Sequence, residues 1–347
     1  MDKILQWLVI GAGPAGIAAV GKLLDHKIPE DQIGWLDPAF QVGDLGGKWQ
    51  RVPSNTKVGL FLQFLSNCHS FRYKDCKEPF TINKLSPHDH CLLKEIAAPL
   101  QWVTDYLTSA VRTMREEAVA LNHGKGCWEV KTRSSLIRAK NVILCIGAES
   151  KQLPFAHPSV VSLETALNPS KLAREINSQD IVGVFGSSHS AVLVLANLLQ
   201  LKPKMIYNFY RSPHLYAVEM KDWILFDNTG LKGTAAEWAK QHLDGTQPRN
   251  LQRCLISDKT FEEVLALCNK VVYAVGFERR KIPVLEQYPT ANYQETTGII
   301  APGLFGLGIA YPQTQLDPLG NKEYRVGLWK FMDYLNTMLP IWIKYGN

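Results

Sequence analysis

The chain has 347 residues, of which 46% are apolar and 20% are charged, and this composition excludes a long disordered or low-complexity protein. The net charge of +6 is scattered, without a block of Lys or Arg, which argues against a nucleic-acid partner. No stretch reaches the roughly 18 apolar residues that a membrane-spanning helix needs. Because one hydrophobic core rarely serves a chain of this length, two domains are expected.

The cysteines and the N-terminus predict a cytoplasmic protein. Seven cysteines, an odd number without a CxxC pair, favour free thiols in a reducing compartment over a disulfide framework. The first apolar run, residues 4–10, leads directly into a glycine motif and has no signal-peptide flanks. Residues 87–91, PHDHC, contain potential metal ligands without a second pair at zinc spacing, so no metal site is predicted.

The first chemical motif is a glycine turn between a predicted strand, residues 4–10, and a predicted helix. Gly11 permits a tight turn, Gly13 lets a pyrophosphate approach the backbone, and Gly16 lets the helix pack on the strand. The helix N-terminus offers its free N–H groups and positive dipole end to phosphates. The residues predicted at the phosphates are Gly11, Gly13, Pro14, Ala15 and Gly16.

An acidic residue follows at the expected distance. The second predicted strand, residues 33–36, ends at Asp37, which lies 26 positions after Gly11. A carboxylate there binds the ribose hydroxyls of a dinucleotide. Strand, glycines, helix and acid in this order predict a dinucleotide-binding fold.

The stretch after Asp37 resembles flavin-containing monooxygenases and related FAD enzymes. Gly46-Gly47-Lys48-Trp49 is similar to their GG-x-W segment, and Asn55-Thr56 is similar to the Asn-Thr stretch that they place beside the flavin. The resemblance implies that FAD is the first cofactor and that these six residues line it.

Three later segments extend the resemblance. The stretch from Val119 to residue 130 resembles the small β-meander over the adenine, and the strand ending at Gly147 resembles the strand that returns to the first domain. Residues 302–310 resemble the last FAD-contacting strand, with Gly308 kept and Ile309 in place of the usual Asp. The contacts with FAD in that region are then expected from backbone N–H groups, Gln313 and Thr314.

A second glycine turn follows the predicted strand 181–185. Gly186 takes the turn position, Ser188 replaces the second glycine, and Ala191 takes the packing position. The residues predicted at the second cofactor are Gly186, Ser187, Ser188, His189, Ser190, Arg211 and Ser212. Arg211, after the next strand, favours a 2′-phosphate and hence NADPH. A second domain that has lost its ligand remains the alternative.

These landmarks predict an α/β protein with two Rossmann-like domains. The FAD domain is discontinuous, residues 1–155 and 285–347, and the NAD(P)H domain, residues 156–284, is inserted between its parts. Residues 214–260 fit neither unit and are predicted to form a substrate-facing insertion. Residues 326–345 form a helix, broken near Pro340, that packs on the FAD domain or contacts a membrane or a second subunit of a homodimer.

Three functions remain open. The resemblance favours an FAD-dependent, NADPH-using monooxygenase that oxygenates a nitrogen, sulfur or carbonyl centre of a small molecule. The second is a flavin reductase that passes electrons to an acceptor, although the CxxC of a thioredoxin-reductase-type enzyme is absent. The third is a non-catalytic FAD-binding module. Phe155 and His157 stand too close together for the F-x-G-x-x-x-H segment of the monooxygenases, and no catalytic residue is assigned.

Overall fold

The computed structural model describes residues 4–154, 159–281, 284–285 and 292–346. The chain forms two compact units. Unit 1 comprises residues 1–50, 57–148 and 279–347, and unit 2 comprises residues 51–56 and 149–278. The divisions lie at 148/149 and 278/279, whereas the sequence placed them at 155/156 and 284/285. Phe155 and His157, which were compared with the F-x-G-x-x-x-H segment of the monooxygenases, lie outside the described residues.

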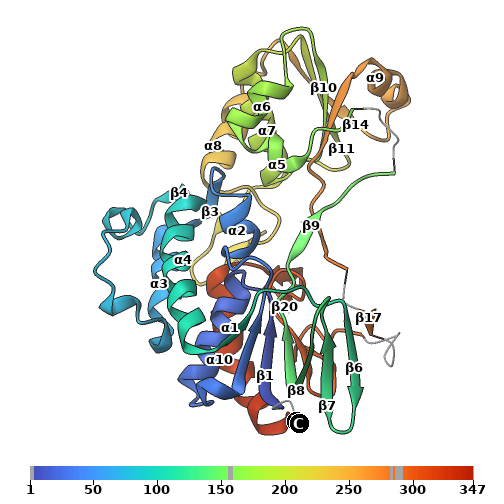
Figure 1. Cartoon of the computed structure of the whole chain (residues 1–347). Coiled ribbons are helices and arrows are strands. Elements are labelled where there is room, and N and C mark those ends of the chain that lie inside the picture. The colour runs from blue at the N-terminus through green and yellow to red at the C-terminus, as the bar shows by residue number, and fades with distance from the viewer. Residues whose placement is uncertain (1–3, 155–158, 282–283, 286–291, 347) are drawn as a thin grey trace. The chain divides into compact units, whose positions relative to one another are not determined.

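Unit 1 is built on a parallel sheet (Figure 1), and the central strands of this sheet are buried. Its strand order is β5-β2-β1-β8-β19. The strands are β1 (Leu5–Ile10), β2 (Ile33–Leu36), β5 (Arg112–Met114), β8 (Leu136–Leu144) and β19 (Leu304–Gly306). The order reverses between β1 and β8, because the chain goes from β1 to β2 on one side and from β8 to β19 on the other. Ligands of such sheets bind beyond the carboxyl ends of the strands at this switch point.

The two faces of this sheet are covered differently. Side chains of Trp7 and Val9 point into a core shared with helices, and those of Leu8 and Ile10 point into a core shared with the meander. The helices are α1 (Pro14–Asp25), α3 (Val58–Ser66), α4 (Leu93–Ala110) and α10 (Leu328–Tyr345). The other face carries β6 (Ala120–Gly124) and β7 (Cys127–Lys131), with β17 (Val284–Leu285) and β18 (Ile299–Ala301) in the same sheet.

The C-terminal helix differs from its prediction. α10 continues through Pro340 to Tyr345 and packs against α1 and α3. Met332, Leu335 and Leu339 on its inner face are fully buried. This packing compensates for the hydrogen bond that a proline inside a helix cannot donate. The expected break at Pro340 is therefore wrong.

Unit 2 is a smaller parallel sheet in the order β14-β11-β10-β15. The strands are β10 (Ile181–Phe185), β11 (Met205–Tyr210), β14 (Leu251–Leu255) and β15 (Lys270–Tyr273). Its main helices are α7 (His189–Leu201), α8 (Gly233–His242) and α9 (Phe261–Leu267). The segment 214–260 is therefore not wholly an insertion, because β14 pairs in parallel with β11. Gln252 and Arg253 interrupt the apolar pattern of that strand and conceal it in the sequence.

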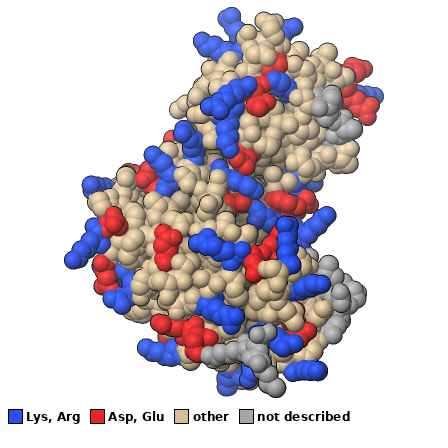
Figure 2. Space-filling view, viewed as in Figure 1, with Lys and Arg blue, Asp and Glu red and all other residues tan. Residues whose placement is uncertain are grey.

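The remaining elements are short. They are η1 (Glu30–Gln32), α2 (Gly43–Gly47), β3 (Pro53–Lys57), η2 (His69–Phe71), η3 (Tyr73–Asp75), η4 (Thr81–Lys84), β4 (His90–Leu92), β9 (Ala148–Ser150), α5 (Leu163–Ala166), α6 (Pro169–Glu175), β12 (Val218–Glu219), β13 (Ile224–Leu225), β16 (Phe277–Arg279), β20 (Gln313–Leu316) and β21 (Lys322–Arg325). None of the helices in the described ranges is both long enough and apolar enough to cross a membrane. Basic and acidic side chains are interspersed over the face shown in Figure 2.

Candidate functional site

The first glycine turn connects β1 to α1 and is tightly packed. The Gly11 N–H donates to the Leu36 carbonyl (2.8 Å), and the Trp35 indole N–H donates to the Gly11 carbonyl (3.0 Å). Gly11 has a φ of +106°, and a Cβ there would lie 2.3 Å from the Cys145 carbonyl oxygen. A Cβ on Gly16 would lie 1.9 Å from the Gly11 carbonyl oxygen. Both positions therefore require glycine for the fold itself.

Gly13 is different because the protein leaves room beside it. A Cβ there would meet nothing closer than a Gly43 atom at 3.9 Å, and its φ of −76° suits any residue. Gly13 is the N-cap of α1, which has no side-chain cap and no acidic residue in its first turn. Pro14 and Ala15 begin this helix, so its N-terminal N–H groups are placed as a phosphate-binding helix terminus requires.

Asp37 is tied to the same turn. Its Oδ2 accepts a hydrogen bond from the Ala12 N–H (2.7 Å), and its Oδ1 accepts from the N–H groups of Ala39 and Phe40 (2.8 and 2.7 Å). An ionised carboxylate offers about four acceptor sites, so capacity for a ribose hydroxyl remains. The Asp37 carboxylate thus aligns the loop, in addition to its predicted role of binding the ribose hydroxyls.

Two residues that the sequence did not indicate adjoin this region. Arg115 follows β5, the neighbour of β2, and its guanidinium lies 5.2 Å from the centre of the Phe40 ring. Its Nη1 also donates to the Ala39 carbonyl (3.0 Å). The sequence feature that could have indicated Arg115 is its position directly after the third strand of a Rossmann unit. Trp35, which holds the Gly11 carbonyl, gave no signal beyond an apolar strand.

The GG-x-W segment is helical only at its two glycines. Gly46 and Gly47 end α2, and Lys48 forms an ion pair with Asp44 (3.2 Å). A Cβ on Gly46 would lie 2.2 Å from the Gln41 carbonyl oxygen, whereas one on Gly47 would meet nothing within 4 Å. The half-buried Trp49 follows directly.

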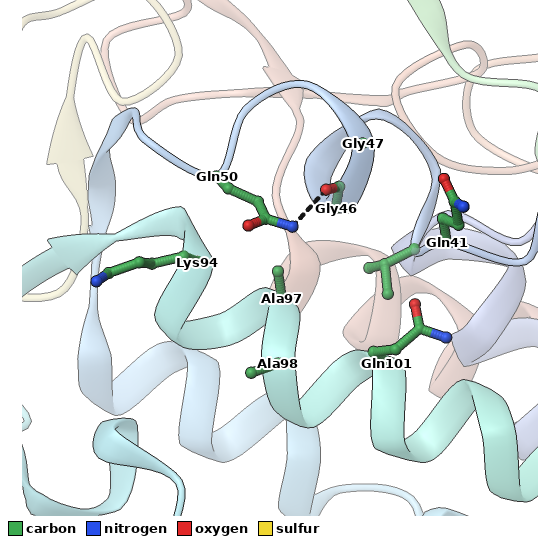
Figure 3. Close-up of a pocket in the computed structure, with 9 residues that line it drawn as sticks. Gln41, Gly46, Gly47, Gln50, Lys94, Ala97, Ala98 and Gln101 are labelled. Atoms are coloured by element: carbon green, nitrogen blue, oxygen red, sulfur yellow. Dashed lines mark hydrogen bonds between the residues drawn. The ribbon is translucent and has the colours of Figure 1, made fainter. Parts of the chain in front are cut away.

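Gly46 and Gly47 line a hollow of about 340 Å³ between α2 and α4 (Figure 3). Gln50 closes one side, because its side-chain amide donates to the Gly46 carbonyl (2.6 Å). The other lining residues are Gln41, Val42, Lys94, Ala97, Ala98 and Gln101. Val42 has a φ of +59°, which is a strained conformation for a β-branched residue.

Gly147 and Gly308 come to the carboxyl edge of the first sheet. Gly147 follows β8 with a φ of +73°, and a Cβ on Gly308 would lie 2.7 Å from the Ala15 side chain in α1. Ile309 is exposed. Gln313 is engaged elsewhere, because its side-chain oxygen accepts from Arg325 Nη1 (3.0 Å).

Three residues that were predicted to bind FAD lie away from the first glycine turn. Val119 precedes β6, its N–H donates to the Lys131 carbonyl (2.8 Å), and two strands of the sheet separate β6 from β1. Asn55 and Thr56 belong to unit 2, where their side chains contact each other at 3.3 Å.

The second glycine turn repeats the contacts of the first at its leading glycine. The Gly186 N–H donates to the Phe209 carbonyl (2.8 Å). A Cβ on Gly186, whose φ is +125°, would lie 2.3 Å from the Ala274 carbonyl oxygen. Ala191 takes the packing position and is fully buried. The replacement of one glycine by Ser188 has therefore not changed the backbone of the turn.

The other predicted residues of this turn lie around the start of α7. Ser187 precedes Ser188, the N-cap, which makes no side-chain cap, and Ser190 lies in a first turn without an acid. The His189 ring lies 3.5 Å from the carbonyl oxygen of Pro53, which is 136 positions away in the sequence. The N-terminus of α7 is built as that of α1 is.

The end of β11 carries a group of polar residues beside this turn. Asn208 donates from its side chain to the Gly186 carbonyl (2.8 Å), and its side-chain oxygen accepts from Arg253 Nε (3.3 Å). The Arg253 guanidinium lies 4.3 Å from the centre of the Tyr210 ring, and its buried Nη2 has no hydrogen-bond partner among the residues that the structure describes. Arg211 and Ser212 follow and are exposed.

The thiols are free and mostly buried. All seven cysteines are described and none is in a disulfide. Burial raises the pKa of the Cys145 thiol well above its usual value, so this group beside Gly11 stays protonated at neutral pH. In the described ranges, no three His, Cys, Asp or Glu side chains gather as metal ligands.

The fold and the two turns can now be compared with known proteins. No protein-family model matches the chain. The monooxygenase AgnR1 of Paecilomyces divaricatus is 34% identical over 382 aligned residues, which cover 97% of both chains. This chain belongs to the monooxygenase family of AgnR1. The predictions of an enzyme and of an oxidoreductase are thereby confirmed.

Solved structures agree with this family in fold. The ornithine N-hydroxylase of Kutzneria sp. 744 covers 99% of both chains, with a TM-score of 0.68 and 12% identity. A flavin-containing monooxygenase from Stenotrophomonas maltophilia covers 99% of this chain and 98% of its own, with a TM-score of 0.66 and 15% identity. The thioredoxin reductase of Lactococcus lactis covers 98% of both chains, with a TM-score of 0.58 and 11% identity. The expected α/β fold with two Rossmann-like units is confirmed for this member of the AgnR1 family.

Proposed function

We propose that this member of the AgnR1 family is an FAD-dependent, NADPH-using monooxygenase that oxygenates a nitrogen, sulfur or carbonyl centre of a small molecule. The observation that carries the proposal is the pair of glycine turns, each followed by a helix without a side-chain cap or an acid in its first turn. Support also comes from the ornithine N-hydroxylase of the same fold, solved with reduced FAD, NADP⁺ and L-ornithine.

The residues of unit 1 fit FAD. The space beside Gly13, where a side chain would have no protein neighbour closer than 3.9 Å, suits a pyrophosphate against the N-terminus of α1. Asp37 keeps acceptor capacity for the ribose at the end of β2. When bound, FAD supplies the redox chemistry of the enzyme, as flavin cofactors do.

The residues of unit 2 fit NADPH. The Gly186 turn and the N-terminus of α7 suit the pyrophosphate, and the exposed Arg211 suits the 2′-phosphate. Asn208 fixes the turn from the neighbouring strand. This intact geometry favours an enzyme over the alternative in which unit 2 has lost its ligand.

The chain's own part in the reaction is to bind and orient the two cofactors and the substrate and to exclude water from them. We assign no side chain to acid–base catalysis. The protonated Cys145 and the absence of a CxxC pair do not support dithiol chemistry. The seven free thiols also support a cytoplasmic location as part of the proposal.

The test is an absorbance spectrum of the purified protein, with and without added FAD, before and after NADPH. We expect flavin bands that NADPH bleaches without oxygen, and oxygen uptake that yields an oxygenated product when a substrate is present. Hydrogen peroxide without an oxygenated product would favour the flavin reductase. Flavin bands that NADPH does not bleach would contradict the role of unit 2. A protein that takes up no FAD would contradict the whole proposal.

A further inference from the structure

Arg280 lies at the carboxyl edge of the sheet in unit 1. Its backbone N–H donates to the carbonyl of Gly147 (3.3 Å). A Cβ built on Gly147 would lie 3.6 Å from Arg280 Nη1, so the guanidinium lies directly against this glycine. Gly147 comes three residues after Leu144, the end of β8. The cation is therefore positioned at the end of the strand that adjoins β1.

The other side of the guanidinium faces α2. Arg280 Nη2 is 2.5 Å from Asp44 Oδ2, and Asp44 follows Gly43 in this helix. A Cβ on Gly43 would lie 2.9 Å from Gly13 Cα, so α2 is packed on the first glycine turn. The Arg280–Asp44 pair consequently extends from the end of β8 to the helix beside Gly13, across the switch point of the sheet.

We propose that Arg280 is a binding residue for the pyrophosphate of the flavin cofactor, and that Asp44 is the partner it gives up when the cofactor binds. This inference rests on the proposed function, since it assumes FAD in unit 1. A guanidinium is planar and always charged, and it binds phosphate oxygens through two parallel hydrogen bonds. The pyrophosphate has two negative charges, against one on the carboxylate.

The ion pair is built so that this exchange is easy. The side chains of Arg280 and Asp44 are 37% and 24% exposed, and ion pairs open to solvent contribute little to stability. Asp44 also has a second cation, because Lys48 Nζ lies 3.2 Å from its Oδ1. The carboxylate therefore stays neutralised after Arg280 leaves it. The pair holds Arg280 at the site before the cofactor arrives.

We expect substitutions of Arg280 and of Asp44 to have opposite effects on FAD binding. We expect Arg280→Gln to raise the Kd of the cofactor-free full chain for FAD at least tenfold, with a weaker dependence of the Kd on salt. Arg280→Lys restores part of the affinity. Asp44→Asn lowers the Kd several-fold, because it removes both the competing partner and a negative charge. The matched control is Arg279→Gln, whose guanidinium lies over the Tyr311 ring at 4.8 Å and whose loss leaves the Kd unchanged.

The measurements are FAD titrations followed by flavin fluorescence at two salt concentrations, together with the melting temperature of each cofactor-free variant. Higher Kd values in both Arg280→Gln and Asp44→Asn would mean that the pair only supports the fold, and would overturn the inference. An unchanged Kd in Arg280→Gln would overturn it as well, while FAD binding to the wild-type chain would leave the proposed function standing. A wild-type chain that does not bind FAD would overturn both.

Discussion

Gly11 and Gly186, 175 positions apart in the sequence, occupy the same place in two separately folded turns. A Cβ on either residue would lie 2.3 Å from a backbone carbonyl oxygen, that of Cys145 in one turn and that of Ala274 in the other. In each case the glycine N–H donates to a carbonyl of the neighbouring strand at 2.8 Å, that of Leu36 at the end of β2 or that of Phe209, one residue before the end of β11. The second turn thus keeps the backbone geometry of the first although Ser188 has replaced a glycine.

The first prediction separates ligand binding from folding at the first turn. We expect Gly13→Ala to keep the melting temperature of the cofactor-free chain within about 2 °C, because the added methyl group has an ordinary backbone conformation and open space. The same methyl group would lie where the pyrophosphate approaches the backbone. FAD binding should therefore weaken by about a hundredfold or more, on the order of 3 kcal/mol. Calorimetry of the cofactor-free chain and FAD titration measure the two quantities.

Gly16→Ala is the matched control for this experiment. Its added Cβ would lie 1.9 Å from the Gly11 carbonyl oxygen, so α1 must move away from β1, and we expect loss of the folded unit rather than of binding alone. Unchanged FAD affinity in Gly13→Ala would show that no phosphate approaches this position.

The sequence was sufficient to predict the two turns because a strand, a glycine turn and a helix follow one another in each. Gly16 meets the Gly11 carbonyl oxygen within one strand–turn–helix unit, where spacing alone determines which atoms meet, whereas the contact of Gly11 with the Cys145 carbonyl depends on the sheet. The contacts of Arg280 and Arg115 were not predictable in this way. Arg280 meets Asp44 across 236 positions, and Arg115 reaches the Ala39 carbonyl across 76. Only the tertiary fold decides which of many arginines is placed there.

The second prediction concerns the choice between NADPH and NADH. We expect Arg211→Ala to raise the KM for NADPH about tenfold or more, as the loss of a hydrogen bond between charged groups implies, on the order of 1.5–3 kcal/mol. The KM for NADH should not change, because NADH has no 2′-phosphate. Steady-state kinetics with both nucleotides measures this. Arg249→Ala, another exposed cation of unit 2, is the control, and equal effects on both nucleotides would contradict the assignment of Arg211.

The third prediction is a pH dependence of stability in unit 2. Asp180 is buried, and burial alone would raise the pKa of its carboxyl group. Hydrogen bonds from the Asn177 N–H (2.7 Å), the Asn269 side chain (2.8 Å) and Lys270 (3.0 Å) outweigh this and hold the pKa below the usual 3.8. A lowered folded-state pKa means that the carboxylate stabilises the protein fully above pH 3.8 and that this contribution is lost as the pH falls through the folded-state pKa.

Asp180→Asn should therefore reduce the free energy of unfolding by about 2 kcal/mol at pH 7. The gap between variant and wild type should shrink once the pH is well below 4. Melting temperatures by calorimetry at pH 7, 5 and 3 measure it, with the exposed Asp258→Asn as control. A gap that stays constant down to pH 3 would show that the charge of Asp180 is not what stabilises the unit.

The sequence predicted less well those elements whose apolar pattern is interrupted or whose stability depends on packing against distant segments. The strand β14 contains Gln252 and Arg253, and Arg253 is accommodated because it lies on the Tyr210 ring at 4.3 Å and bonds to Asn208. Pro340 stays inside α10 because neighbouring residues such as Leu339 are packed in the core. In both cases tertiary packing overrides the local preference of the residue.

The last prediction uses the hollow beside α2 to test whether the GG-x-W segment contacts the cofactor. A Cβ on Gly47 meets no protein atom within 4 Å, whereas one on Gly46 would lie 2.2 Å from the Gln41 carbonyl oxygen. We expect Gly46→Ala to lower the melting temperature of the cofactor-free chain by several degrees, because α2 must shift away from residue 41. Gly47→Ala should leave that temperature unchanged. If FAD lies against this end of α2, Gly47→Ala should still weaken its binding about tenfold, since the methyl group occupies open space that the cofactor would fill. A Gly47→Ala chain that binds FAD with wild-type affinity would place the cofactor elsewhere and limit the glycine requirement in this segment to the packing of Gly46.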